Sequence, residues 1–264
     1  MSTTTAVPER QAAPAAMSAE EWQTRCDLAA CYQLVDLYGM SDLAGTHISA
    51  RVPGTEHFLL NPYGMFFDEI TASSLIKVDV DGKVLDGRSD PINPAGFVIH
   101  SAIHMARPEL TCVLHTHTRA NNAIAMQKDG LLPLTQKALM LRDFLGYYDY
   151  EGAALDLDER ERMARAFPPG RRVVILRNHG ALTAGRSIPE AFMFMKRLED
   201  ACRYQVDGLA GGRELNWLSD KAVERTAAQG TKILGPGGHA EYGPRSWPPL
   251  LRKLERERGT AYRT

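Results

Sequence analysis

The spacing of apolar positions near the N-terminus predicts one amphipathic helix. Apolar side chains recur every three or four positions from Trp22 to Tyr38, and Gly39 ends the pattern. Ser18 and Glu21 stand three positions apart, as in a capping box, where each side chain bonds the backbone N–H of the other residue. We therefore expect a helix that begins just after Ser18 and ends near Tyr38.

Between residues 46 and 85 the pattern changes to short apolar segments separated by turn residues. Residues 46–52 and 57–61 are predicted as paired strands joined by Pro53-Gly54. Residues 75–80 and 83–85 flank Asp81-Gly82, a dipeptide typical of a tight hairpin turn. This part of the chain is therefore expected to form β-hairpins.

The remainder alternates between predicted helices and strands. Asn93-Pro94 caps a helix that extends to about Met105 and stops before Arg107-Pro108. The alternation indicates an α/β fold, with helices layered on one central, mostly antiparallel sheet. Further helices are predicted over residues 120–128, 136–144, 158–167 and 187–209, strands over 110–117 and 172–177, and a terminal helix from Trp247.

Length and composition suggest one domain with a tail. The 264 residues suffice for a single large domain with a full core. Residues 1–17 are rich in Thr, Pro and Ala and lack the apolar stretch of a signal peptide, so we expect a disordered N-terminal tail. We assign residues 18–264 to a single domain, whose C-terminal segment, residues 213–264, is a candidate interface or lid.

Charge and cysteine usage exclude several classes of function. The 31 Lys and Arg residues balance 32 Asp and Glu residues, so no basic excess is available for nucleic acid. No apolar run approaches the ~18 residues of a membrane helix. The four cysteines are scattered without CxxC spacing, which is typical of reduced thiols. We expect a cytoplasmic protein with neither nucleic-acid nor membrane partners.

The strongest chemical signal is the pair His115 and His117, at the end of the predicted strand 110–117. Residues two apart on a strand point to the same face, so both imidazoles can converge on one point. His179 follows the strand 172–177, and a neighbouring strand would bring it alongside. Three neutral imidazoles with an open coordination position make a site for one divalent metal, Zn, Mn or Fe. In the alternative, structural interpretation, the pair lies on an exposed strand and His179 caps a turn with Gly180.

A second pair, His100 and His104, stands four positions apart on the helix that begins at Asn93. A zincin helix has this spacing but needs Glu after the first His, where this chain has Ser101. We therefore expect one imidazole to pack against the sheet and the other to face the cleft, where His47 is also expected.

Seven segments, taken in order, resemble the class II aldolase/adducin family. They are residues 45–51 (GTHISAR), 59–64 (LLNPYG), 71–75 (TASSL), 93–102 (NPAGFVIHSA), 107–109 (RPE), 113–117 (VLHTH) and 176–180 (LRNHG). The similarity covers roughly residues 20–210. Several segments, notably Ala-Gly-Phe and Thr-Ala-Ser-Ser, look closer to the adducin head domain than to the sugar-phosphate aldolases.

The resemblance implies a three-layer α/β/α class II aldolase-like fold. It also implies a homotetramer with active sites near the subunit interfaces. In the family's aldolases, the histidines that match His115, His117 and His179 bind zinc, which stabilises an enediolate. The intact set of three histidines favours a working metal site.

The chain departs from the aldolase pattern where substrate binds and protons move. Gly96 stands where the aldolases carry a proton-transferring Glu. Pro94-Ala95 replace a Ser-Ser pair that helps to hold substrate phosphate, His47 replaces an Asn, and Tyr63 replaces a hydroxyl residue of the phosphate loop. A phosphate site needs backbone donors, small residues and hydroxyls. We therefore do not expect an orthodox sugar-phosphate aldolase.

These departures favour a metal-dependent carbon–carbon lyase, either a decarboxylase or a retro-aldolase. Its substrate would be a small oxo-, hydroxy- or aromatic carboxylic acid bound by the metal. Decarboxylation needs no base to start, which suits the glycine at position 96. The predicted catalytic residues are His47, His104 and Tyr63, and the predicted substrate contacts are Arg51, Asn61, Gly64 and Gly96.

Two alternatives stay open. An Fe(II) ion on the same three histidines could activate oxygen, and the resemblance includes non-haem iron oxygenases that act on aryl-pyruvate-type acids. The adducin head implies instead a non-catalytic oligomeric module. Against the module, three converging histidines are hard to explain in a chain that makes no use of metal.

Overall fold

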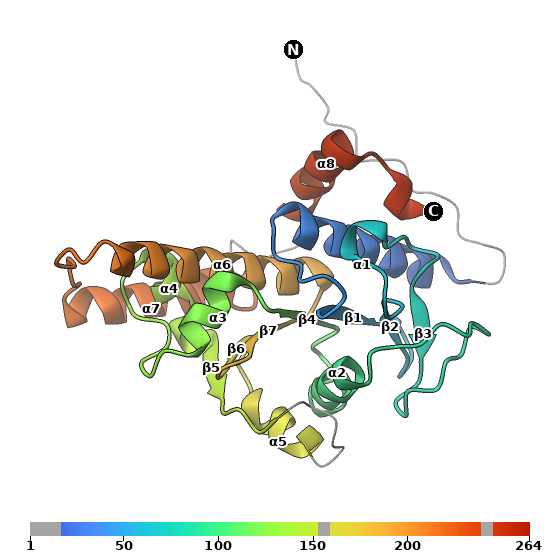
Figure 1. The fold of residues 1–264 in the computed structure, drawn as a ribbon, viewed down its shortest axis with the longest axis horizontal. Helices are drawn as coiled ribbons and strands as arrows, with labels where there is room; N and C mark the ends of the chain where they lie inside the picture. The colour runs from blue at the N-terminus through green and yellow to red at the C-terminus, as the bar shows by residue number, and fades with distance from the viewer. Residues whose placement is uncertain (1–16, 153–158, 239–244) are drawn as a thin grey trace.

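One seven-stranded sheet organises the fold (Figure 1). The computed structural model describes residues 17–152, 159–238 and 245–264. The predicted N-terminal tail, apart from Met17, lies outside the described residues.

The strands form a mostly antiparallel sheet, as predicted. They are β1 (His47–Arg51), β2 (Phe58–Leu60), β3 (Ile76–Val78), β4 (Cys112–Thr116), β5 (Leu145–Tyr148), β6 (Val173–Leu176) and β7 (Gly180–Gly185). Their spatial order is β3-β2-β1-β4-β7-β6-β5. Every neighbouring pair runs antiparallel except β5 and β6, which run parallel.

Eight α-helices accompany the sheet in the described part of the chain. Two serines act as N-caps. The side chain of Ser18 accepts from the N–H of Glu21, as predicted, and that of Ser187 accepts from the N–H of Glu190. The helices are α1 (Ala19–Leu37), α2 (Pro94–Ala106), α3 (Arg119–Ala125), α4 (Gln136–Leu141), α5 (Glu159–Ala166), α6 (Ile188–Ala210), α7 (Asp220–Leu234) and α8 (Trp247–Arg258).

Helices cover both faces of the sheet, which gives the three-layer arrangement (Figure 1). On one face α1 and α6 pack over Ile48 and Leu114. On the other face α2 and α5 pack over Val113 and Leu182. Side chains alternate along a strand, so the neighbours Val113 and Leu114 enter opposite layers. His115 shares the face of Val113 and therefore points towards the α2 layer.

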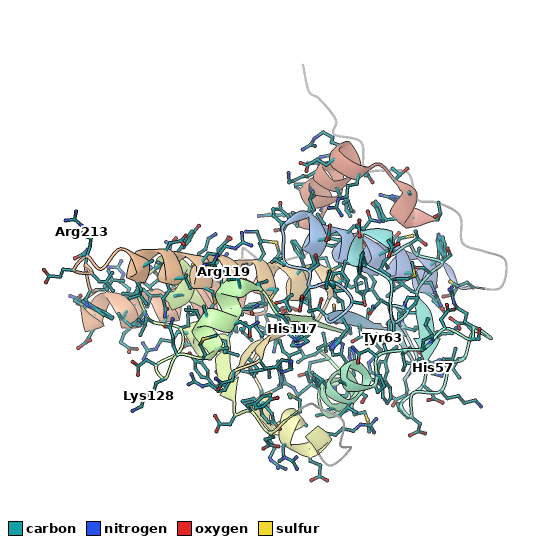
Figure 2. All side chains as sticks on the ribbon, viewed as in Figure 1. His57, Tyr63, His117, Arg119, Lys128 and Arg213 are labelled. Carbon is teal, nitrogen blue, oxygen red and sulfur yellow. The ribbon has the colours of Figure 1, made fainter. Side chains whose placement is uncertain are left out.

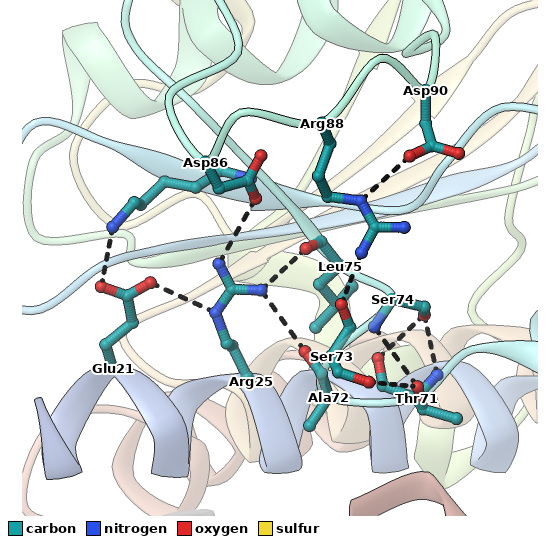
Figure 3. A network of polar contacts seen from close by, with 11 residues as sticks. Glu21, Arg25, Thr71, Ala72, Ser73, Ser74, Leu75, Asp86, Arg88 and Asp90 are labelled. Atoms are coloured by element: carbon teal, nitrogen blue, oxygen red, sulfur yellow. Dashed lines mark hydrogen bonds and ion pairs between the residues drawn. The ribbon is translucent and has the colours of Figure 1, made fainter. Parts of the chain in front are cut away.

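A buried ionic network connects the start of α1 to the segment 71–75 (Figure 3). Arg25 is 2% exposed and donates to the carbonyl oxygen of Leu75 at 2.7 Å. Its guanidinium also lies 3.2 Å from Glu21 and 3.7 Å from Asp86. A buried cation without partners would be costly, so these contacts compensate its loss of water. The segment 71–75 therefore has a structural role.

The structure differs from the predicted elements in two respects. Residues 83–85 form no strand, because they pair with β3 only through one isolated bridge, between Val84 and Val78. That predicted hairpin arm is wrong. The strands β5 and β7 and the helix α7 were not predicted, and the turn that precedes β7 carries His179.

No helix within residues 17–152, 159–238 and 245–264 is both long and apolar enough to cross a membrane. The four cysteines are all buried and free, as expected for reduced thiols. Burial raises the pKa of the Cys26 thiol from 9.0 to about 11, so this thiol stays protonated at neutral pH.

Candidate metal centre

Three histidines meet at the end of β4. His115 lies on β4, His117 follows its last residue, and His179 comes from the turn between β6 and β7. One ring nitrogen from each lies within 4.8 Å of the others, and no other such group of three possible ligands occurs in the described ranges. Figure 2 shows His117 between α2 and α3. The predicted convergence of the three histidines is therefore confirmed.

The hairpin of β6 and β7 places His179. β7 pairs with β4, with Ala181 opposite Thr116, so the turn before β7 lies beside the end of β4. Asn178 has a φ of 58°, in the left-handed region that Asn tolerates better than most residues. A Cβ on Gly180 would lie 2.5 Å from the carbonyl oxygen of Thr116. These requirements explain the Asn-His-Gly sequence of the turn.

Hydrogen bonds at the second ring nitrogen orient two of the rings. Nδ1 of His115 lies 3.0 Å from the carbonyl oxygen of Ala181, which can only accept, so Nδ1 carries the proton. Nδ1 of His117 lies 3.1 Å from a carboxylate oxygen of Asp42. Both rings therefore present the lone pair of Nε2. Carbonyls and carboxylates support metal-binding histidines in this way in many proteins.

Asp42 lies in the loop between α1 and β1 and was missed by the sequence analysis. Its carbonyl accepts from the N–H of Gly45 at 2.8 Å, which closes a tight turn. Leu43, inside this turn, has a φ of 46°, a conformation that costs a leucine about 1–2 kcal/mol. The loop is thus held in an unfavourable conformation that brings Asp42 to His117, 75 positions away in sequence.

The spacing of the ring nitrogens suits one divalent ion. Two ligands at tetrahedral angles, with Zn–N bonds of about 2.0–2.1 Å, lie about 3.3 Å apart. The Nε2 atoms of His117 and His179 lie 3.0 Å apart, close to that value. Three protein ligands leave a fourth position for water or substrate, as in catalytic zinc sites. Imidazole ligands alone do not distinguish Zn, Mn and Fe.

Burial favours the neutral form of His115 and His179. Loss of water, together with the nearby His47, His117 and His179, lowers the pKa of His115 well below its ordinary value of 6.5. Burial and the neighbouring His117 lower the pKa of His179 from 6.5 to about 4. Neutral imidazoles keep the lone pairs that a metal ion requires.

His47 stands beside the three histidines and excludes any side chain at position 96. Its ring centroid lies 5.0 Å from that of His115 and 4.6 Å from that of His100. A Cβ on Gly96 would lie 2.6 Å from Cδ2 of His47, closer than real Cβ contacts allow. The His47 ring therefore requires glycine at this position of α2.

Residues 26–206 match the family described as Class II Aldolase and Adducin N-terminal domain. The chain belongs to this family. A protein of Pseudomonas aeruginosa that is named for the aldolase class 2 family is 49% identical over 247 residues, which cover 92% of this chain and 93% of that protein. Mouse alpha-adducin is 41% identical over 230 residues, which cover 84% of this chain but 31% of the adducin. The predicted family is confirmed.

Two solved structures share the class II aldolase fold across nearly the whole chain. An aldolase II superfamily protein from Pseudomonas syringae has a TM-score of 0.87 and 46% identity, and the match covers 94% of this chain and 98% of that one. L-fuculose 1-phosphate aldolase from Glaciozyma antarctica has a TM-score of 0.79 and 27% identity, with 97% of both chains covered. The predicted fold is therefore confirmed, and the aldolase members of the family are lyases.

Within this family, the departures at positions 47 and 96 lie next to each other in this chain. The resemblance assigns a proton-transferring Glu to position 96 in the aldolases. In this chain the His47 ring fills the space into which such a side chain would extend from α2. Glycine at position 96 and the imidazole of His47 are therefore compatible with each other, whereas a side chain at position 96 would overlap the ring.

Two predicted residues, His104 and Arg51, pack against Phe58 on β2. His104 is fully buried and stacks on Phe58 with ring centroids 4.6 Å apart, as expected for the member of the pair that packs against the sheet. Arg51 donates to the carbonyl oxygen of His104, and its guanidinium lies 5.2 Å from the Phe58 centroid. Neither residue has a described contact with His115, and their roles in catalysis and substrate binding stay predictions.

Three further predicted residues lie on the loop after β2. Asn61 is buried and accepts a hydrogen bond from the hydroxyl of Tyr32 at 2.8 Å. Tyr63 is 53% exposed and lies on the β2–β3 side of His117 in Figure 2. Gly64 has a φ of 100°, a conformation that favours glycine. No described contact joins these residues to the three histidines, and their roles stay predictions.

Tyr150 lies near the candidate metal centre. Its ring centroid is 6.5 Å from that of His179, and the side chain is 58% exposed. Together with Ile99, Met163 and His179 it lines a small cavity of about 10 Å³, room for about one water molecule. The cavity lies on the His179 side of the candidate metal centre, and aromatic, aliphatic and charged side chains all line it.

Proposed function

We propose that the chain is a divalent-metal-dependent carbon–carbon lyase, a decarboxylase or a retro-aldolase, for a small oxo-, hydroxy- or aromatic carboxylic acid. The observation that carries this proposal is the convergence of His115, His117 and His179. Two of these rings are oriented through Ala181 and Asp42 so that Nε2 is presented. A metal held by them acts as a Lewis acid on a carbonyl or carboxylate oxygen. Membership in the class II aldolase family supports the reaction class.

The N-terminus of α2 supports a carboxylate substrate over a phosphate ester. Free backbone amides at a helix start commonly bind phosphate. Pro94 has no N–H, and the amides of Ala95 and Gly96 donate to the Asn93 side chain at 3.1 and 3.3 Å. The N–H of Phe97 donates to the carbonyl oxygen of Asn93. All amides of this first turn are therefore occupied within the chain, which leaves the metal as the proposed anchor of the substrate.

His47 is the residue that we propose to exchange a proton with the substrate. Its ring lies 5.0 Å from that of His115, in the volume beside Gly96. An imidazole can accept a proton at one nitrogen and return it later. Retro-aldol cleavage requires the removal of a hydroxyl proton, and decarboxylation requires the return of a proton to carbon. One residue in this place serves either reaction.

The remaining parts of the proposal concern location and assembly. Four free cysteines and a net charge of −1 support a cytoplasmic protein without nucleic-acid or membrane partners. A homotetramer is proposed from the family resemblance.

A substrate screen tests this function. The untagged chain and its His117→Ala variant are loaded with Zn²⁺, Mn²⁺ or Fe²⁺ and incubated with small hydroxy, oxo and aromatic acids. We expect release of CO₂ or an aldehyde with the unchanged chain alone, at the same rate with and without air. Turnover that consumes oxygen would contradict the lyase and favour the iron oxygenase. A chain that binds no metal and turns over none of these acids would favour the adducin-like module.

A further inference from the structure

A line of buried polar side chains leads from His47 into the space between β1 and α2. Ser49 shares a face of β1 with His47, and His100 and His104 lie one turn apart on α2. Nδ1 of His47 lies 2.8 Å from Nε2 of His100, whose Nδ1 lies 2.7 Å from Oγ of Ser49. Oγ of Ser49 lies 2.7 Å from Nε2 of His104, whose Nδ1 lies 3.0 Å from the carbonyl oxygen of Leu110.

The Leu110 carbonyl determines the direction of every hydrogen bond along this line. A neutral imidazole has one N–H and one lone pair, and a carbonyl can only accept. His104 therefore donates from Nδ1 to Leu110 and accepts at Nε2 from the Ser49 hydroxyl. Because Ser49 has a single O–H, its oxygen accepts from Nδ1 of His100. His100 then accepts at Nε2 from Nδ1 of His47, which leaves the lone pair of His47 on Nε2.

Burial keeps the donor and acceptor directions of these hydrogen bonds fixed. The side chains of His47, Ser49, His100 and His104 are each at most 3% exposed, so water cannot replace the partners. Burial, with the nearby charge of Arg51, lowers the pKa of His104 from 6.5 to about 3. Burial, His104 and His115 likewise lower the pKa of His100. The opposite order would set the lone pair of His104 Nδ1 against the Leu110 carbonyl oxygen at 3.0 Å.

We propose that Ser49, His100 and His104 form a relay that fixes His47 in its Nδ1–H tautomer, with the Nε2 lone pair available beside the metal centre. The three relay members are positioning residues, and His104 acts through the others instead of touching the substrate. The lone pair at His47 Nε2 can accept a hydrogen bond from a substrate hydroxyl, whereas a substrate carbonyl oxygen would repel it because both atoms present lone pairs. This inference rests on the proposed function, and it restricts the substrate class to hydroxy acids.

The test reads the tautomers directly in the full-length chain. Histidine labelled with ¹⁵N is incorporated, and two-bond ¹⁵N–¹H spectra distinguish a nitrogen that bears a proton from one with a lone pair. Spectra are recorded without metal and after addition of Zn²⁺. Ser49→Ala removes the central hydroxyl. Ser101→Ala is the matched control, because the Ser101 hydroxyl is equally buried but donates to its own helix, at the Val98 carbonyl.

In the unchanged chain we expect His47, His100 and His104 all as Nδ1–H tautomers, although an exposed neutral histidine ordinarily favours Nε2–H. Ser49→Ala should leave His104 unchanged and give His47 a mixture of tautomers, and Ser101→Ala should match the unchanged chain. His47 in the Nε2–H form in the unchanged chain would overturn the relay, as would a His47 signal unaffected by Ser49→Ala. Absence of bound zinc with the expected tautomers would refute the proposed function and leave the relay standing.

Discussion

Replacing Gly96 by Ala tests the contact between α2 and His47. A Cβ at this position would lie 2.6, 2.8 and 2.9 Å from three atoms of the His47 ring. The ring cannot easily move away, because it is 3% exposed and tied to His100 by a 2.8 Å hydrogen bond. The added methyl therefore meets a fixed neighbour and not the flexible end of a long side chain.

Two effects of opposite sign determine how much Gly96→Ala changes the free energy of unfolding. Ala in place of Gly stabilises an unobstructed helix by about 0.5–1 kcal/mol. An extra methyl in a packed interior costs about 1–3 kcal/mol. Gly208 in α6 isolates the first effect, because a Cβ there would meet nothing within 4 Å. We expect the free energy of unfolding of Gly96→Ala to lie about 1–3 kcal/mol below that of Gly208→Ala.

Urea denaturation at one protein concentration measures this difference, since the stability of an oligomer depends on concentration. A double-mutant cycle with His47→Ala then shows whether this loss of stability comes from the contact with the His47 ring. We expect most of the loss caused by Gly96→Ala to disappear once the His47 ring is absent, with a coupling of about 1–3 kcal/mol. Equal stability of Gly96→Ala and Gly208→Ala would refute the reasoning, as would a loss that persists without the ring.

Three other perturbations have definite expected results. Asp42→Asn removes the charge at Nδ1 of His117 and should weaken Zn²⁺ binding about 10- to 100-fold in a chelator competition; unchanged affinity would count against the proposed support. Gly230→Ala places a Cβ 2.5 Å from the Met140 carbonyl oxygen, where backbone cannot yield, and should lower the urea midpoint, corresponding to about 1–3 kcal/mol; a midpoint like that of the unchanged chain would contradict the close α4–α7 packing. Burial lowers the pKa of His104 to about 3 from 6.5, so the unfolded chain binds more protons below pH 6.5 and stability falls with decreasing pH, by about 1.4 kcal/mol per pH unit from this residue. Urea midpoints at pH 7, 6 and 5 that do not change would be inconsistent with its neutral burial.

Local sequence patterns were sufficient to predict some helices and strands and part of the candidate metal centre. The helix α1 was predictable because its capping serine, its apolar spacing and its terminal glycine are all local features. His115 and His117 could be paired from sequence because strand periodicity alone sets their common direction. His179 was a third candidate because it follows the strand 172–177, and the family resemblance strengthened this candidate and supplied the three-layer fold.

Other features depend on contacts between distant segments. β7 has the sequence Gly-Ala-Leu-Thr-Ala-Gly, whose small residues carry little strand preference, and it becomes a strand because β4 and β6 pair with it on both sides. Asp42 carried no motif, and its loop reaches His117 only in the folded chain. The role of Ser49 could not be predicted either. Strand alternation predicts the face to which its side chain points, but it does not predict that α2 lies opposite that face.

The central claim is that His115, His117 and His179 hold one divalent metal ion, and metal content tests it most directly. The chain is purified without a metal-chelating tag and analysed by mass spectrometry beside His117→Ala and the control His57→Ala, which changes a histidine outside the cluster. We predict about one Zn, Mn or Fe per chain in the unchanged protein and in His57→Ala, and almost none in His117→Ala. An unchanged protein without metal, or equal metal in all three proteins, would contradict the account.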